Sequence, residues 1–291
     1  MKKLIINLGF ILGVSTMVVG CTDYLDSDYL FEERVNIENV FQSKDYTNEW
    51  LAKGYAYMKH DYLQQVNSKK NTSFNFADDM YYIDLNYVDW KGGNYTEKGL
   101  GSGNSLYIWQ AAYQAIRHVS IFIHNVDSNK ELTEAEITDM KGQAHFLRAY
   151  FYWMLIRSFG PVPIVPDEGV DYTKEYDEIA YPRSTYDECA DYIAEELVKA
   201  ATMLDDERDV QNIVRPTRGA ALALRSRVLL YAASPLYNGQ APSEVIDALV
   251  DKSGRKLLSD TYDNRKWARA AAAAKDVMEL KRYQLYVAYK R

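Results

Sequence analysis

One stretch of the sequence combines aromatic rings with acidic side chains at spacings that fit no helix. Between residues 71 and 105, aromatic residues are interspersed with glycines and aspartates. Aromatic rings can stack on the apolar faces of sugar rings, while carboxylates can hydrogen-bond sugar hydroxyls. We therefore expect a loop insert that binds a ligand. Its candidate ligand-binding residues are Trp90, Asp79, Tyr82, Tyr87 and Tyr95.

The same insert has a second interpretation. A loop of this length is usually functional or disordered, and its many aromatic residues argue against disorder. The rings can instead bury the loop against neighbouring helices, and for a single tyrosine that role is the more common one. For Trp90, which precedes Lys91-Gly92-Gly93, exposure at a loop tip and burial are equally compatible with the sequence.

The residue patterns of common catalytic and metal sites are missing. The sequence has no Gly-x-Ser-x-Gly elbow, no Walker loop and no His-Glu-x-x-His zinc motif. His118 and His124 are six residues apart, which places them on different faces of a helix. Carboxylates are abundant, so a glycosidase pair stays open as an alternative, although no pair stands out. We expect no catalytic residue, no metal and no cofactor.

The N-terminal residues have the order of a lipoprotein secretion signal. Two lysines precede an apolar run over residues 4–19, which is shorter than the roughly 20 residues of a spanning helix. Val18-Val-Gly-Cys21 resembles a bacterial lipobox, in which Cys21 would be acylated with palmitate and related chains. We expect a signal peptide at 1–20 and an acidic tether at 21–35. The alternative is an ordinary signal peptide with an incidental cysteine.

The net charge and the number of cysteines limit the classes of protein to which the chain can belong. The 291 residues carry a formal net charge of −7, and removing residues 1–20 with their two lysines leaves 32 basic and 41 acidic residues, or −9. Such an acidic chain is a poor candidate for nucleic-acid binding. If Cys21 is acylated, Cys189 has no disulfide partner, and its place on an apolar helical stripe predicts a buried free thiol.

Apolar residues recur at helical spacing along most of the chain, which predicts an all-α fold. Helices are expected at 40–64, at 106–126, from Thr133 to the stop at Gly160-Pro161, from Ser184, from Thr217 and over 264–280. Thr133 and Glu136 fit a capping box. Residues 220–233 are apolar almost all round, which predicts a central helix buried on most sides.

The order of these helices suggests one domain. Helix pairs joined by turns are typical of tetratricopeptide-like packing, although the strict repeat pattern is missing and a generic helical bundle is the alternative. We expect this helical domain to occupy residues 36–291 and to carry the irregular insert at 71–105.

An ordered series of motifs resembles the SusD/RagB family of outer-membrane nutrient-binding lipoproteins. The series covers nearly the whole chain after the lipobox, and the series as a whole is what makes the resemblance specific. One departure is Ser120, where members commonly have Asn. The motifs are Cys21-Thr-Asp-Tyr-Leu-Asp, Asp78-Asp79, Trp109-x-x-x-Tyr113-x-x-Ile116-Arg117, the segment 143–165, Arg183-Ser-Thr-x-x-Glu188 and the segment 215–237.

The resemblance implies a fold and a function. It implies a tetratricopeptide-like helical scaffold on the outer membrane, anchored through Cys21 and exposed at the cell surface. It also implies a non-catalytic role, in which the protein captures an oligosaccharide or other nutrient and passes it to a TonB-dependent transporter. Family members are longer, so we expect the chain to correspond to their N-terminal portion. A helical scaffold without its own ligand is the main alternative, and a glycoside hydrolase is another.

Overall fold

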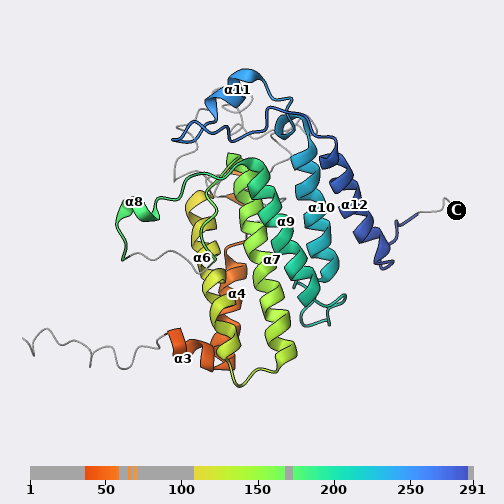
Figure 1. The fold of residues 1–291 in the computed structure, drawn as a ribbon. Coiled ribbons are helices and arrows are strands. Elements are labelled where there is room, and N and C mark those ends of the chain that lie inside the picture. The colour runs from red at the N-terminus through yellow and green to blue at the C-terminus, as the bar shows by residue number, and fades with distance from the viewer. Residues whose placement is uncertain (1–36, 59–64, 67–68, 71–107, 168–172, 288–291) are drawn as a thin grey trace, which may run out of the picture.

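The computed structural model describes residues 37–58, 65–66, 69–70, 108–167 and 173–287, and these residues are predominantly helical (Figure 1). The two strands, β1 (Gln65–Val66) and β2 (Lys69–Lys70), pair antiparallel. The expected all-α class is confirmed. The helices are α3 (Ile37–Gln42), α4 (Lys44–Ala56), α6 (Trp109–Asn125), η4 (Val126–Ser128), α7 (Glu134–Phe159), α8 (Tyr176–Ile179), α9 (Tyr186–Met203), α10 (Arg218–Ala233), η5 (Pro235–Tyr237), α11 (Ser243–Ala248) and α12 (Arg265–Glu279).

The long helices form an up-and-down array in chain order. Contacts join α4 to α6, α6 to α7, α7 to α9, α9 to α10 and α10 to α12 (Figure 1). Successive helices are antiparallel: Trp109 at the start of α6 meets Phe159 at the end of α7, and Arg218 at the start of α10 donates to the carbonyl of Ala201 near the end of α9. This is the packing expected of tetratricopeptide-like helix pairs.

Helix α7 is the centre of the array. Its start has the predicted capping box, because the Thr133 hydroxyl accepts from the amide of Glu136 while the Glu136 carboxylate accepts from the amide of Thr133. It ends at Phe159, and Gly160 follows with φ of 69°, which an L side chain rarely adopts. Residues from both sides of the helix are buried, because α6 covers one side and α9 covers another.

Two predicted helix boundaries are wrong. The expected helix at 40–64 is two helices, α3 and α4, separated at Ser43, and α4 ends at Ala56. Helix α9 is capped by Thr185, not Ser184: the Thr185 hydroxyl accepts from the amide of Glu188, whose carboxylate accepts from the amide of Thr185. The apolar stripe predicted for α9 is confirmed, and Cys189 is buried with a free thiol.

The predicted burial of the 220–233 helix is also wrong. Helix α10 begins as expected after Thr217, whose hydroxyl accepts from the amide of Ala220. It packs on α9 and α12, but Leu230 and Tyr231 are 49% and 42% exposed. The apolar pattern of residues 220–233 therefore did not identify the central helix. The central helix is α7, because α6 packs on one side of it and α9 packs on another.

Candidate ligand-binding site

The predicted ligand-binding residues lie outside the described part of the chain. Trp90, Asp79, Tyr82, Tyr87 and Tyr95 all fall in the range 71–107, and the lipidation candidate Cys21 falls in 1–36. The structure does describe residues on either side of this range in the sequence. Among them are the end of α4, at Tyr57 and Met58, and the residue before α6, Ile108.

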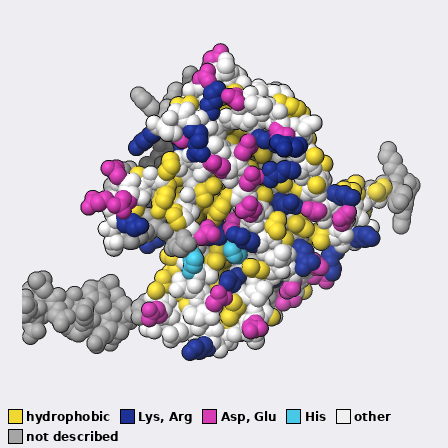
Figure 2. All heavy atoms as spheres, viewed as in Figure 1, with side chains coloured by type: hydrophobic (Ala, Val, Ile, Leu, Met, Phe, Trp, Pro, Cys, Tyr) yellow, Lys and Arg dark blue, Asp and Glu magenta, His cyan; other side chains and the backbone are white. Residues whose placement is uncertain are grey.

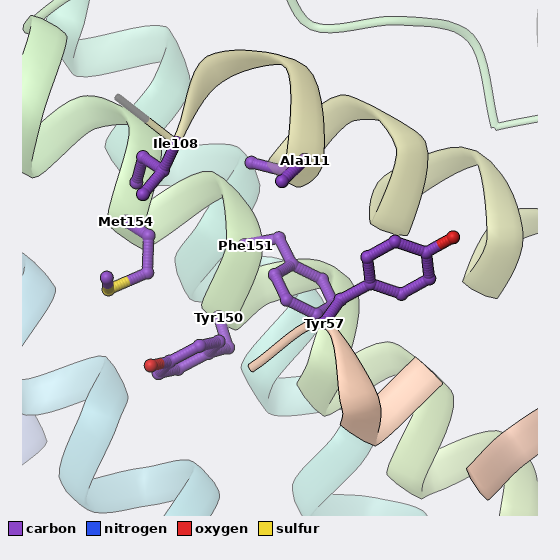
Figure 3. A pocket seen from close by; sticks show the side chains of 7 residues that line it. Tyr57, Ile108, Ala111, Tyr150, Phe151 and Met154 are labelled. Atoms are coloured by element: carbon purple, nitrogen blue, oxygen red, sulfur yellow. The ribbon is translucent and has the colours of Figure 1, made fainter. Parts of the chain in front are cut away.

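Tyr57 and Ile108 line the same pocket (Figure 3). Helix α7 supplies Tyr150, Phe151 and Met154 to the lining, and Figure 3 shows these side chains together with Tyr57 and Ile108. Phe151 and Met154 are buried, whereas Tyr57 and Tyr150 are half-buried. The lining residues are Tyr57, Ile108, Ala111, Ala112, Tyr150, Phe151 and Met154.

The pocket is small and mostly apolar. Two of its residues are tyrosines, which combine a flat ring with a hydroxyl that can donate or accept. Its cavity volume is about 10 Å³, which is room for about one water molecule. It is therefore a shallow apolar surface that a ligand could contact, and it does not enclose a sugar ring.

The pocket wall at Tyr57 is held by a contact between α4 and α6. Trp50 stacks on His118 with ring centroids 4.6 Å apart, its indole donates to the carbonyl of His118, and His118 Nε2 lies 2.7 Å from the carbonyl of Trp50. Desolvation lowers the pKa of His118. The ring of Tyr57 packs beside His118 and has Lys53 Nζ 5.7 Å from its centroid. These contacts hold the end of α4 against α6.

A buried ionic cluster lies between α6, α7 and α9. The carboxylate of Glu196, with 0% exposure, accepts from His145 Nδ1 at 2.8 Å and from Arg148 Nη2 at 2.7 Å. Lys199 donates to its other oxygen at 2.8 Å. Burial acts to raise the pKa of Glu196, but the hydrogen bond from His145 and the charge of Arg148 together hold it at about 2. The carboxylate is therefore ionised and fully paired.

The same Arg148 extends the cluster to α6 and to the segment after α7. Its Nη1 donates to Ser120 Oγ at 3.3 Å and lies 3.3 Å from Asp167 Oδ1. Ser120 is thus a short hydrogen-bond partner in place of the family's more common Asn. Tyr192 of α9 donates to the same Asp167 oxygen at 2.9 Å. The cluster connects three helices and a loop, so His145 and Arg148 serve to hold these elements together.

The loop from Gly160 to Asp167 lies across the ends of these helices and is attached by tyrosines. Tyr113 donates to the carbonyl of Pro163, and Tyr152 accepts from the amide of Val165. Burial raises the pKa of both phenols far above the usual value of 10, so they stay protonated. Tyr113 and Tyr152 therefore serve the fold by attaching this loop to α6 and α7.

The described residues offer no obvious catalytic or metal centre. Glu196 is inaccessible and already paired, so it cannot donate a proton to a bound substrate. Within the described ranges, no group of three His, Cys, Asp or Glu side chains is placed to hold a metal ion. On the face shown in Figure 2, acidic and basic side chains are interspersed rather than gathered by sign.

Comparison with known proteins identifies the family. Residues 23–230 match a SusD-like family model described as starch-binding and associating with the outer membrane. The chain belongs to the SusD-like family. Among curated proteins, no relative matches this SusD-like chain.

Solved structures agree with the fold. The chain matches one named BT4246 at 26% identity and a TM-score of 0.63, covering 82% of this chain and 40% of that one. It matches a SusD homolog from Bacteroides thetaiotaomicron at 19% identity and a TM-score of 0.62, covering 88% and 44%. A SusD-like protein from Bacteroides fragilis matches at 22% identity and a TM-score of 0.59, covering 84% and 40%.

These comparisons confirm the resemblance and the tetratricopeptide-like scaffold. The SusD-like chain spans less than half the length of the solved structures that it matches. In the part of the chain that the structure describes, no helix is both long and apolar enough to cross a membrane.

The sequence did not predict the pocket at Tyr57 and Phe151. Its residues come from the end of α4, the start of α6 and α7, so no single motif contains them. One signal was present: Tyr150 lies outside the main apolar stripe of the α7 segment, next to Phe151, which lies in it. An aromatic residue beside a buried stripe is a candidate for a partly exposed wall.

Proposed function

We propose that this chain is part of a cell-surface lipoprotein that binds a glycan and passes it to a TonB-dependent outer-membrane transporter. The observation that carries the proposal is the match over residues 23–230 to a family described as starch-binding and associating with the outer membrane. The lipobox-like segment at Cys21 supports an acyl anchor in that membrane.

The site proposed for the glycan combines the insert at 71–105 with the pocket. Tyr57 and Ile108 line the pocket, and in the sequence they precede and follow the insert. Trp90, Tyr82, Tyr87 and Tyr95 would supply further stacking surfaces, and Asp79 would accept hydrogen bonds from sugar hydroxyls. A shallow apolar surface with two tyrosines, together with a segment that has several aromatic residues, suits an oligosaccharide better than a small polar nutrient.

The role of Trp90 can be tested by affinity electrophoresis against a panel of polysaccharides. We expect Trp90→Ala to abolish the retardation seen for the unchanged protein while its melting temperature stays the same. Tyr46→Ala is the matched control, because Tyr46 is 47% exposed and is near the other end of α4 from Tyr57, about 16 Å along the helix axis. Lost binding in both variants, or binding kept in both, would argue against a ligand site at Trp90.

The non-catalytic role needs a separate experiment. Incubation with every oligosaccharide that binds should release no new reducing ends. Release that one carboxylate substitution abolishes would establish a glycoside hydrolase in place of a carrier. If no polysaccharide binds at all, the remaining candidate is a helical scaffold without its own ligand.

The anchor and the partner can be tested in cells. We expect labelled palmitate to enter the protein and to be lost in Cys21→Ser. We also expect the TonB-dependent transporter to co-purify with the protein when the outer membrane is dissolved in mild detergent. Labelling that survives Cys21→Ser would contradict the proposed anchor.

A further inference from the structure

The contact between Trp50 and His118 joins α4 to α6 in both directions. The two rings stack almost parallel, with 5° between their planes. Each residue also bonds the backbone of the other. The Trp50 indole donates to the carbonyl of His118 at 3.0 Å, and His118 Nε2 lies 2.7 Å from the carbonyl of Trp50. The imidazole is therefore part of the connection between the two helices and not only a neighbour of it.

This contact selects one form of the imidazole. A backbone carbonyl only accepts hydrogen bonds, so Nε2 of His118 carries a proton and donates to the carbonyl of Trp50. In the neutral ring, Nδ1 then has no proton. Protonation of Nδ1 adds a full charge to a ring that is half-buried between two helices. Burial penalises that charged form.

The surroundings of the ring lower the pKa of His118 below its usual value of 6.5. Desolvation is the largest cause, and the positive charge of Lys53 acts in the same direction. The hydrogen bond to the carbonyl of Trp50 acts the other way but does not reverse the shift. Lys53 follows Trp50 by one turn of α4, so a protonated His118 would have a second cation close by.

No carboxylate of the described helices around the ring offsets this charge. Helix α6 has no acidic residue, and α7 borders this part of α4 with Leu147, which lies beside Gly54 next to the His118 ring. The acidic residues of α7 are in its first two turns, and those of α4 are exposed and do not shift the pKa of His118. These are Glu134, Glu136 and Asp139 of α7, and Asp45 and Glu49 of α4.

The charge of His118 also acts on the side of the pocket that α4 forms. Tyr57, which lines the pocket, packs beside His118 with ring centroids 5.9 Å apart. Lys53 Nζ lies 5.7 Å from the centroid of the same Tyr57 ring. Trp50, Lys53 and Tyr57 follow one another at spacings of three and four, which places them on one side of α4.

We propose that the Trp50–His118 contact is sensitive to pH, and that protonation of His118 loosens the end of α4 and with it the Tyr57 side of the pocket. Because the pKa of His118 is lower in the folded chain, the contact stabilises the packing of α4 fully above pH 6.5. That contribution is lost as the pH falls from 6.5 through the lower folded value. An effect on a bound glycan rests on the proposed function, whereas the loosening of α4 does not.

Hydrogen exchange of α4 tests the loosening in the chain carrying Cys21→Ser, which removes the expected acylation site. After correction for the intrinsic pH dependence of amide exchange, we expect the protection of residues 44–57 to fall at least about threefold between pH 7.5 and pH 5.0. His118→Gln can still donate to the carbonyl of Trp50 but does not titrate, so its protection should not change with pH.

His124→Gln is the matched control, because it makes the same change at an exposed histidine of α6. It should show the same fall in protection as the chain with His124. Protection of α4 that is equal at the two pH values, or a fall of the same size in His118→Gln, would overturn the proposal.

A proton NMR titration of the imidazole tests the proposal without a substitution at the contact. The signal of His118 is identified by its loss from the spectrum of His118→Gln. The stacked indole attracts a cation, so this titration measures the balance between that attraction and the opposing effects of burial and Lys53. We expect a pKa below 6.5, and a value of 6.5 or above would contradict the proposal. Neither measurement uses a glycan, so its failure is distinct from failure of the proposed function.

Discussion

At the scale of single residues, the buried carboxylate of Glu196 decides how α7 and α9 are joined. Burying one charge without a partner costs several kcal/mol, so a carboxylate with 0% exposure persists only with its counter-ions in place. Arg148 supplies the positive charge from α7, and His145, one turn away, supplies a hydrogen bond. In the structure, these residues of the 143–165 motif form the polar connection between two core helices.

Glu196→Gln is predicted to destabilise the protein by about 3 kcal/mol at pH 7, because it leaves Arg148 and His145 buried beside a neutral group. The pKa of Glu196 is about 2 in the folded chain against a usual 4.5. A lowered pKa stabilises the fold above pH 4.5, and this contribution of about 3 kcal/mol is lost as the pH falls towards 2. The difference between wild type and variant should therefore shrink from pH 7 to pH 3.

Urea unfolding at the two pH values measures this difference. Glu195→Gln is the control, since Glu195 is the exposed neighbour on the same helix and its loss should change stability by less than about 0.5 kcal/mol. An equal destabilisation by Glu196→Gln at pH 7 and pH 3 would show that ionisation of this carboxylate contributes nothing to the fold.

At the scale of elements, local sequence predicted most helices because caps and apolar stripes act within one or two turns. The Thr133 capping box and the stop at Gly160 are confirmed. The predicted start of α9 was wrong because two adjacent residues could each cap the helix. Ser184-x-x-Asp187 and Thr185-x-x-Glu188 have the same pattern, and only the structure shows that the longer Glu188 side chain reaches back to its cap.

The corrected cap of α9 gives a prediction that separates two adjacent residues. Thr185→Ala should cost about 1 kcal/mol, because it leaves the amide of Glu188 without its acceptor. Ser184→Ala should cost much less. The backbone amide of residue 184 donates to the carbonyl of Val162, and alanine keeps that amide. Thermal unfolding of the two variants decides between them, and equal losses would restore Ser184 as a contributor to the cap.

Close packing of α7 on the end of α9 gives a second prediction at this scale. A Cβ added to Gly142 would lie 2.8 Å from Met203 Cβ and 3.1 Å from the side chain of Leu204. Alanine normally stabilises a helix interior by up to about 1 kcal/mol relative to glycine. Here we expect Gly142→Ala to lower stability by about 1–3 kcal/mol, because the clash outweighs the propensity. A raised melting temperature would show that the two helices separate at little cost.

At the scale of the whole molecule, the burial of each helix and the shape of the pocket depend on which helices pack together. The sequence alone did not predict these helix neighbours. The apolar pattern of 220–233 suggested a central helix, but α10 is half-exposed because its neighbours cover only part of it. The pocket at Tyr57 likewise combines residues from three helices and their ends, which only the fold could show. The candidate residues Trp90, Asp79, Tyr82, Tyr87 and Tyr95 remain predictions outside the described residues.

The most direct test of the proposed glycan site is calorimetric titration of the protein with the oligosaccharide that it binds best. Tyr57→Leu keeps an apolar side chain but removes the flat ring and the hydroxyl from the pocket, so we predict binding at least tenfold weaker, or about 1.4 kcal/mol. Tyr46→Leu, with the same chemical change near the far end of α4, should bind as the wild type does. Equal dissociation constants for Tyr57→Leu and wild type, or no heat of binding with any glycan, would contradict the account.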